Sequence, residues 1–187
     1  MWQITLQTCN SFKYFKYVYL QATIRPWEVQ TLIHVVKQQK GDIFSIKMTG
    51  SIEESVDFMA LVGMPPTQRV EILLREVTRI NSLGVKAWIK YFQTLQAKAL
   101  QVRLVECSTA IVEAINSIVN FTCGATVESL YVPYVCKGCK TELLGLFRAA
   151  DLKKFAFKIP PLTCSKCQSE ATFDDIPEEY FGFLIRK

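Results

Sequence analysis

The sequence predicts an α/β fold, in which helices pack on a sheet of about four strands, followed by a small cysteine-rich unit. Between residues 43 and 135, short runs of β-branched and apolar residues alternate with segments of helical periodicity. After residue 135, two Cys-x-x-Cys pairs are separated by 24 residues. The alternation is typical of a sheet with some parallel pairing, and the cysteine pairs set the last part of the chain apart.

The composition is that of a globular protein. Of the 187 residues, 50% are apolar and 21% are charged, and no low-complexity tract occurs. No apolar stretch approaches the ~20 residues of a membrane-spanning helix. Lys13 and Lys16 interrupt the N-terminal stretch that would have to serve as the apolar core of a signal peptide. We therefore expect no membrane segment and a cytoplasmic location.

The positive charge is concentrated near the N-terminus. The net charge is +5, and residues 1–40 hold five Lys or Arg against one Glu. No long basic run occurs, so the charge predicts weak attraction to polyanions and no dedicated surface for a specific nucleic acid.

The first part of the expected sheet can be followed in order. Residues 43–50 are expected to form a strand that ends in a glycine turn. Residues 51–62 are expected to form a helix, with Ser51 and Ser55 as candidate caps. Residues 69–80 are rich in β-branched and apolar side chains, which predicts a central strand covered on both faces.

The second part of the sheet continues the alternation. A helix is expected from Val85, because apolar side chains recur from there at intervals of three and four residues. A strand at 100–107 and a helix at 109–121 follow. Residues 126–135 are expected to be the last extended stretch.

The first forty residues contain no motif. Residues 14–24 have the composition of a strand, and Trp27 to Lys37 suit a short helix. The expected organisation has three parts: an N-terminal extension of uncertain structure at 1–40, an α/β domain at 41–135 and a cysteine-rich domain at 136–187.

The four paired cysteines carry the clearest chemistry. They are Cys136 and Cys139 in the first pair and Cys164 and Cys167 in the second. Two thiolates at i and i+3 across a tight turn chelate one edge of a tetrahedron, and a second pair supplies the opposite edge. This arrangement predicts a Cys₄ zinc ribbon in a reducing compartment, with a turn in which Gly138 adopts a positive φ.

Zinc held in this way is expected to be structural, because four sulfur ligands leave no coordination position for a substrate. The alternatives are a redox pair and an incidental pairing. A redox pair of the thioredoxin type needs one Cys-x-x-Cys that opens a helix after a strand, rather than two facing pairs.

The other polar residues indicate no enzyme site. The single histidine, His34, lies in an apolar stretch, which is more typical of a packed or surface histidine than of a catalytic one. No phosphate-binding or dinucleotide-binding glycine motif occurs. Glu53, Glu54 and Asp57 are expected to place negative charge at the N-terminus of a helix. Cys107 and Cys123 are expected to be buried as small apolar side chains.

Two segments carry a resemblance to a known family. They are FSIKMTGSIEES and VEILLREVTRINSLGVKAWIKYFQTLQAKALQVRLVECSTAIVEAIN; in the second, a strand runs into an Asn-Ser-Leu-Gly loop and a helix. Both resemble the STAS domain, the fold of bacterial anti-sigma-factor antagonists and of the cytoplasmic tails of sulfate transporters. The C-terminal part is similar to the zinc-ribbon extension of some bacterial STAS-like proteins.

The resemblance implies a protein–protein switch without catalysis. Antagonists of this family bind a kinase-like anti-sigma factor and release it when the second hydroxyl residue of the loop is phosphorylated. In this chain Asn81 takes the position of the family's Asp, Ser82 takes the first hydroxyl position, and Leu83 takes the phosphoacceptor position, before Gly84. These four residues form a candidate partner-binding loop in which the usual switch is degenerate.

The same loop also has a simpler interpretation. Asn81 or Ser82 is placed to cap the helix that follows, since both side chains accept hydrogen bonds from free backbone N–H groups. With Val85 and Trp88 buried, Leu83 falls on the exposed side of the helix, where it suits a standing contact with a partner.

The leading hypothesis is a non-enzymatic signalling module of the anti-sigma-factor-antagonist type, with structural zinc and a protein partner such as an anti-sigma factor or a kinase-like regulator. The alternative is a zinc-ribbon protein that binds nucleic acid. Against it, residues 136–187 contain nine basic and seven acidic residues, and the segment FDDIPEEYF would repel phosphate. An enzyme is the third class, and no group of residues supports it.

Overall fold

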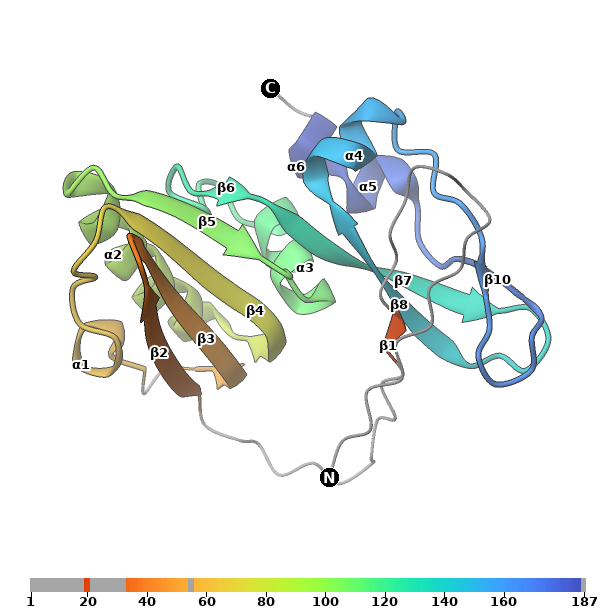
Figure 1. Ribbon diagram of the computed structural model, residues 1–187, viewed down its shortest axis with the longest axis horizontal. Helices are drawn as coiled ribbons and strands as arrows, with labels where there is room; N and C mark the ends of the chain where they lie inside the picture. Colours follow the sequence, from red (N-terminus) through yellow and green to blue (C-terminus); the bar gives the residue numbers. More distant parts are fainter. Residues whose placement is uncertain (1–18, 21–32, 54–55, 186–187) are drawn as a thin grey trace.

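A computed structural model describes residues 19–20, 33–53 and 56–185 of the chain, and within these residues it shows two five-stranded sheets (Figure 1). One sheet is mixed and carries helices, and the other is antiparallel. The expectation of an α/β fold is confirmed at this level, with a second sheet after it; the mixed sheet has five strands where about four were expected. In the part of the chain that the structure describes, no helix is both long and apolar enough to cross a membrane.

The mixed sheet has its strands in the order of the sequence. These strands are β2 (His34–Lys40), β3 (Ile43–Ile52), β4 (Arg69–Ile80), β5 (Gln101–Val105) and β6 (Thr126–Val127). β2 and β3 form an antiparallel hairpin, and each later strand is parallel to the one before it. The parallel strands are joined through α1 (Phe58–Leu61), α2 (Ser82–Ala97) and α3 (Thr109–Ser117).

The helices cover one face of this sheet. Because consecutive parallel strands are neighbours, right-handed crossovers place every connecting helix on the same side. The burial of β4 follows from this, since Val70, Ile72 and Leu74 are fully buried and Glu71 between them is not. The expectation that residues 69–80 are covered on both faces is therefore wrong.

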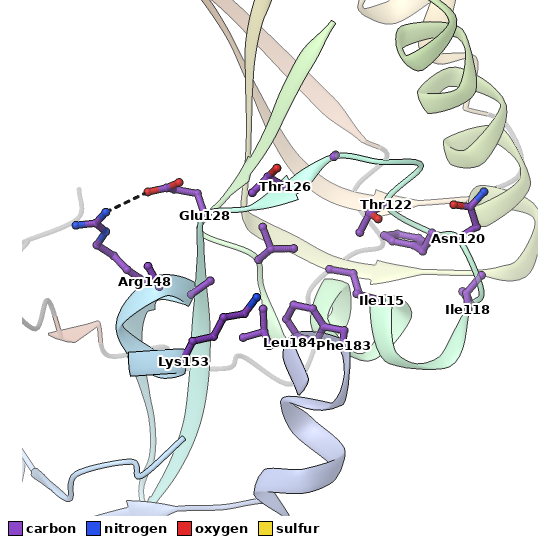
Figure 2. Close-up of a pocket in the computed structure, with 15 residues that line it drawn as sticks. Ile115, Ile118, Asn120, Thr122, Thr126, Glu128, Arg148, Lys153, Phe183 and Leu184 are labelled. Carbon is purple, nitrogen blue, oxygen red and sulfur yellow. Dashed lines mark ion pairs between the residues drawn. The ribbon is translucent and has the colours of Figure 1, made fainter. Parts of the chain in front are cut away.

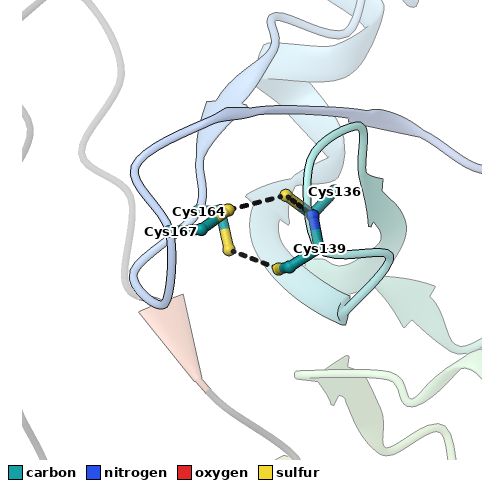
Figure 3. A group of neighbouring side chains, drawn as sticks. All are labelled: Cys136, Cys139, Cys164 and Cys167. Atoms are coloured by element: carbon teal, nitrogen blue, oxygen red, sulfur yellow. Dashed lines mark hydrogen bonds between the residues drawn. The ribbon is translucent and has the colours of Figure 1, made fainter.

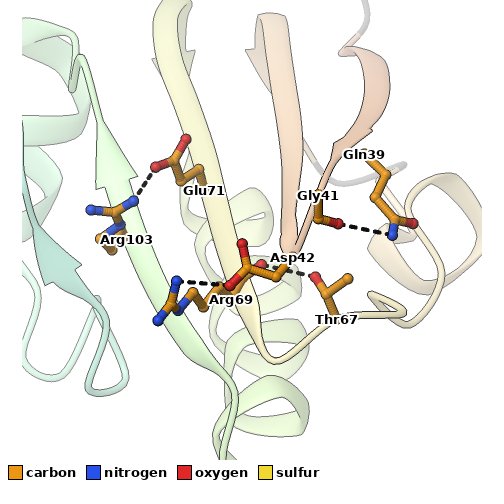
Figure 4. A network of polar contacts seen from close by, with 7 residues as sticks. All are labelled: Gln39, Gly41, Asp42, Thr67, Arg69, Glu71 and Arg103. Carbon is orange, nitrogen blue, oxygen red and sulfur yellow. Dashed lines mark hydrogen bonds and ion pairs between the residues drawn. The ribbon is translucent and has the colours of Figure 1, made fainter.

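Charged side chains of β4 form ion pairs with neighbouring strands and with the turn between β2 and β3. Glu71 forms an ion pair with Arg103 of β5, and Arg69 forms one with Asp42 at 2.7 Å (Figure 4). Glu76 pairs with a lysine of β3 at 2.6 Å. Such ion pairs on an exposed surface contribute little stability, but they make the uncovered face of the sheet polar.

Aromatic rings fill the space between the mixed sheet and α2. Trp88 stacks on Phe92 at 4.2 Å and on Phe121 at 5.1 Å between ring centroids. Its indole N–H donates to the backbone oxygen of Phe121 at 3.0 Å. Tyr91 stacks on Phe58 of α1 and donates its hydroxyl to a loop carbonyl. The expected helical stripe therefore packs as the core, with Tyr91 added to it.

The second sheet is built from two hairpins and an added edge strand. Its order is β1 (Tyr19–Leu20), β8 (Glu142–Arg148), β7 (Ser129–Cys136), β10 (Glu170–Phe173) and β9 (Leu162–Thr163). Three short helices lie together beside it: α4 (Ala149–Lys154), α5 (Pro177–Tyr180) and α6 (Gly182–Ile185) (Figure 1).

The chain passes directly from the first sheet into the second. β6 pairs with β5, whereas β7 pairs with β8 and β10, so residues 126–135 are not one strand of the α/β sheet as expected. Cys107 forms a bridge to Leu130 at the point of transfer. Residues of β7 are almost all buried, and the strand lies between β8 and β10 in the second sheet (Figure 1).

Two further local expectations are wrong. Ser51 does not cap a helix, because β3 continues to Ile52 and Ser51 pairs with β4. The helix cap is Asp57, whose carboxylate accepts from two backbone N–H groups of α1 at 2.9 and 3.1 Å. His34 to Lys37 belong to strand β2 rather than to a short helix.

The remaining parts of these expectations lie outside the described residues. This applies to Glu54 and Ser55 and to most of residues 1–32, apart from β1.

Candidate functional site

The four paired cysteines converge at one end of the second sheet. Cys136 is the last residue of β7, and Cys139 lies in the turn that leads to β8. Cys164 follows β9, and Cys167 lies in the turn that leads to β10. Because β10 pairs with both β7 and β9, the two turns face each other (Figure 3).

The two cysteine turns have the same backbone structure. In each, the N–H of the residue four positions after the first cysteine donates to that cysteine's carbonyl, at 3.1 Å from Lys140 and 2.9 Å from Gln168. These two residues also adopt the left-handed conformation, with φ of 57° and 61°. The first cysteine of each turn donates its own N–H to the residue five positions on.

Gly138 has a different role from the one expected. Its φ is not positive, and the left-handed residue of this turn is Lys140. A Cβ at position 138 would lie 2.5 Å from Oγ of Ser169 and 3.3 Å from Sγ of Cys167. A side chain at position 138 would therefore have to displace Ser169 of the opposite turn.

The four sulfur atoms have the spacing of a metal-binding cluster. Sγ of Cys136 lies 3.4 Å from Sγ of Cys167, and Sγ of Cys139 lies 3.6 Å from Sγ of Cys164. All four lie within 4.8 Å of one another. A tetrahedral ion with metal–sulfur bonds of about 2.3 Å holds its sulfurs about 3.8 Å apart. A disulfide, with sulfurs about 2.05 Å apart, does not match these distances.

A hydroxyl group lies beside the second cysteine of each turn. Oγ1 of Thr141 is 3.2 Å from Sγ of Cys139. The contacts with the side chain and then the backbone of Thr141 lower the pKa of the Cys139 thiol. The side chain and then the backbone of Ser169 lower the pKa of Cys167 to about 6. Both contacts favour the thiolate, which is the form that binds a metal.

A lysine beside the cluster, Lys137, is paired with a residue of β10. Lys137, which follows the first cysteine, forms an ion pair with Glu170 at the start of β10. Its backbone N–H also donates to the carbonyl of Glu170 at 2.9 Å. Lys137 therefore links the first cysteine turn to the hairpin of β9 and β10, and its ammonium group pairs with Glu170 rather than with the sulfur atoms.

The Asn-Ser-Leu-Gly loop lies at the carboxyl end of β4. Oδ1 of Asn81 accepts from the backbone N–H of Leu83 at 3.1 Å and of Gly84 at 2.8 Å. The backbone N–H of Asn81 donates to the carbonyl of Ile52 at 3.1 Å. The expectation that Asn81 or Ser82 caps the helix is confirmed for Asn81.

Gly84 fixes the position of this loop against β3. A Cβ at position 84 would lie 2.2 Å from the carbonyl oxygen of Ile52. No side chain fits there, so the first turn of α2 packs directly on the end of β3. Ser82 and Leu83 remain exposed on this turn, with 44% of Leu83 accessible.

The other candidate residues are dispersed. His34 is exposed at the start of β2. Cys107 and Cys123 are buried as expected, and burial raises the pKa of Cys107 to about 12. Glu53 lies between β3 and α1 rather than in the helix.

The sequence does not predict a role for the hydroxyl groups of Thr141 and Ser169. One pattern does mark them, since each stands two residues after the second cysteine of its pair.

No protein-family model matches the chain, and no curated protein matches it.

Proposed function

We propose that this chain is a STAS-like protein-interaction module of the bacterial anti-sigma-factor-antagonist type, carrying a structural zinc site and acting without catalysis in the cytoplasm. The observation that supports this function is the hydrogen-bonded, closely packed loop between β4 and α2. It holds Leu83 in solvent on a turn fixed by Asn81 and Gly84.

The geometry of the loop favours a standing contact over a phosphate switch. Leu83 is 44% exposed at the tip of α2, although its backbone N–H is held by the Asn81 side chain. An apolar side chain presented on an ordered turn loses little conformational freedom when a partner covers it. The partner we propose is an anti-sigma factor or a kinase-like regulator, bound through this turn.

The metal we propose is zinc. Four thiols at tetrahedral spacing form a donor set that suits Zn²⁺. A bound ion would hold the two cysteine turns together and would have no open position for a substrate, so its contribution would be to folding.

Binding to a purified kinase-like anti-sigma factor tests the interaction. We expect Leu83→Asp to abolish binding without unfolding the chain. Val119→Asp is the matched control, because Val119 is an exposed apolar residue elsewhere in the chain, 93% accessible, and its replacement should leave binding unchanged. Equal binding by both variants would contradict the proposal.

Two other experimental results would change parts of the proposed function. Stoichiometric phosphate on Ser82, with Ser82→Asp blocking the partner, would show a switch in shifted form. Tight, sequence-selective binding of nucleic acid with a steep salt dependence would favour the nucleic-acid alternative.

Metal analysis tests the zinc site separately. We expect about one zinc per chain, since four converging thiolates typically bind Zn²⁺ with ~10–16 kcal/mol of apparent free energy. Finding no metal, together with a disulfide between Cys136 and Cys139 in mass spectrometry, would overturn this assignment.

A further inference from the structure

A cavity of about 520 Å³ lies where the two parts of the molecule meet (Figure 2). One wall comes from α3 and the chain that leads from it to β6. The other wall comes from α4 and α6 beside the second sheet. Its volume is in the range of small-molecule sites, which often form between structural units.

The walls of the cavity carry both apolar and polar side chains. Their apolar side chains come from both parts of the molecule, and those that are half-buried there are Ile115, Ile118, Val127, Phe183 and Leu184. All five pack against the buried core, and Figure 2 shows Ile115, Ile118, Phe183 and Leu184 among the residues that line the cavity. A ligand with an apolar body would therefore remove more apolar surface from water.

The charged groups of the cavity leave one positive charge free. Arg148 and Glu128 lie 3.6 Å apart and form an ion pair. Lys153 of α4 is exposed to solvent, and its side chain extends toward the cavity (Figure 2). Within the residues that the structure describes, Lys153 has no ion-pair partner. A ligand with one negative charge would match this ammonium group.

We propose that the cavity binds a small organic anion, namely a carboxylate with an apolar chain of medium length. The carboxylate would lie at Lys153, and the chain would lie along Ile118 and Leu184. This site is separate from the partner-binding loop, since none of residues 81–84 lines the cavity.

The core supplies a reporter for binding. Phe121 lines the cavity, stacks on Trp88 at 5.1 Å and accepts the indole N–H of Trp88 at 3.0 Å. In a full-length chain carrying Trp2→Phe and Trp27→Phe, the remaining indole N–H signal in NMR belongs to Trp88. Filling the cavity should shift this signal.

Titration with decanoate below its micelle concentration tests the proposal. We expect saturable binding of one decanoate per chain by calorimetry, with a shift of the Trp88 signal. Acetate has the charge without the chain, and decanol and decylammonium have the chain without the negative charge. All three should bind at least about fivefold more weakly.

Substitutions locate the site. Lys153→Gln should weaken decanoate binding about fivefold, whereas Lys154→Gln should not, because Lys154 does not line the cavity. Leu184→Asp should abolish decanoate binding while metal content and thermal unfolding show a folded chain.

Three outcomes would overturn the proposal. One is equal binding of decanoate, decanol and decylammonium, and another is unchanged affinity in Lys153→Gln. The third is a dimer in light scattering that Leu184→Asp dissociates, because the cavity would then be a contact between copies of the chain.

Discussion

Asn81 and Ser82 are adjacent small polar residues, and only one of them holds the helix. Asn81 accepts two backbone hydrogen bonds from the first turn of α2, whereas Ser82 is exposed. We expect Asn81→Ala to lower the free energy of unfolding by about 1 kcal/mol in urea denaturation. Ser82→Ala is the matched control and should leave it nearly unchanged. Equal losses in the two variants would contradict this assignment of the cap.

We expect Ser169 to influence the pH at which the cysteine cluster releases its metal. Its hydroxyl lowers the pKa of Cys167, so it favours the thiolate against protons. Without the hydroxyl that pKa rises, and protons displace the metal at a higher pH. We therefore expect Ser169→Ala to release metal at higher pH than the native chain, as measured with a zinc-sensitive dye during acid titration.

Ser165 provides the control for this pH shift. It is an exposed serine in the same cysteine turn, and Ser165→Ala should leave the release midpoint unchanged. A midpoint that moves equally in both variants would mean that Ser169 does not act through the thiolate.

At this scale, local sequence predicts some roles and misses others. The spacing of the four cysteines predicts their meeting, because two tight turns suffice to chelate one ion. The role of Gly138 follows from its approach to Ser169, which is 31 residues away and reaches it only through the pairing of β10 with β7. No local pattern contains that contact.

The strands that carry the second cysteine turn are short, and this makes them dependent on metal. β9 has two residues and β10 has four, and isolated short strands are marginal in water. We expect Cys164→Ser to release the metal and to remove hydrogen-exchange protection from residues 162–173. β4 and β5 should keep their protection, because they lie in the core of the mixed sheet.

A second cysteine tests whether the effect comes from the metal. Cys107 is fully buried and lies far along the chain from the cysteine turns, so Cys107→Ala should lower stability without releasing metal. Protection of residues 162–173 that survives in metal-free Cys164→Ser would contradict the dependence on metal.

The periodicity of apolar residues predicts some helices and strands correctly, but it does not predict the boundaries of others. α2 follows from its apolar spacing, since sixteen residues give a clear helical pattern. Residues 126–135 read as one strand, because every position suits extended backbone. The division into β6 and β7 arises from pairing with two different sheets, which depends on distant partners.

Across the whole molecule, the C-terminal segment joins the two parts. Asn116 of α3 donates to the carbonyl of Tyr180 at 2.9 Å and accepts from the backbone N–H of Phe183 at 3.0 Å. Tyr180 in turn donates its hydroxyl to the carbonyl of Tyr131 in β7. The cysteine-rich part is therefore attached to the helical layer of the first sheet by more than its covalent connection.

This attachment should make the two parts unfold together. With Co²⁺ in the cysteine cluster, thiolate absorption reports on the second sheet. Fluorescence of Trp88, in a chain carrying Trp2→Phe and Trp27→Phe, reports on the first. We expect the two signals to change at the same urea concentration, since a shared interface couples neighbouring units.

Asn116→Ala should separate the two transitions. It removes both hydrogen bonds and leaves a partly buried carbonyl and N–H without their partners, which typically costs about 1–3 kcal/mol for each group. The cobalt signal should then be lost at lower urea than the fluorescence signal. Glu113→Ala, on the exposed side of the same helix, should leave the transitions coincident. Transitions that stay coincident in Asn116→Ala would show that other contacts hold the two parts together.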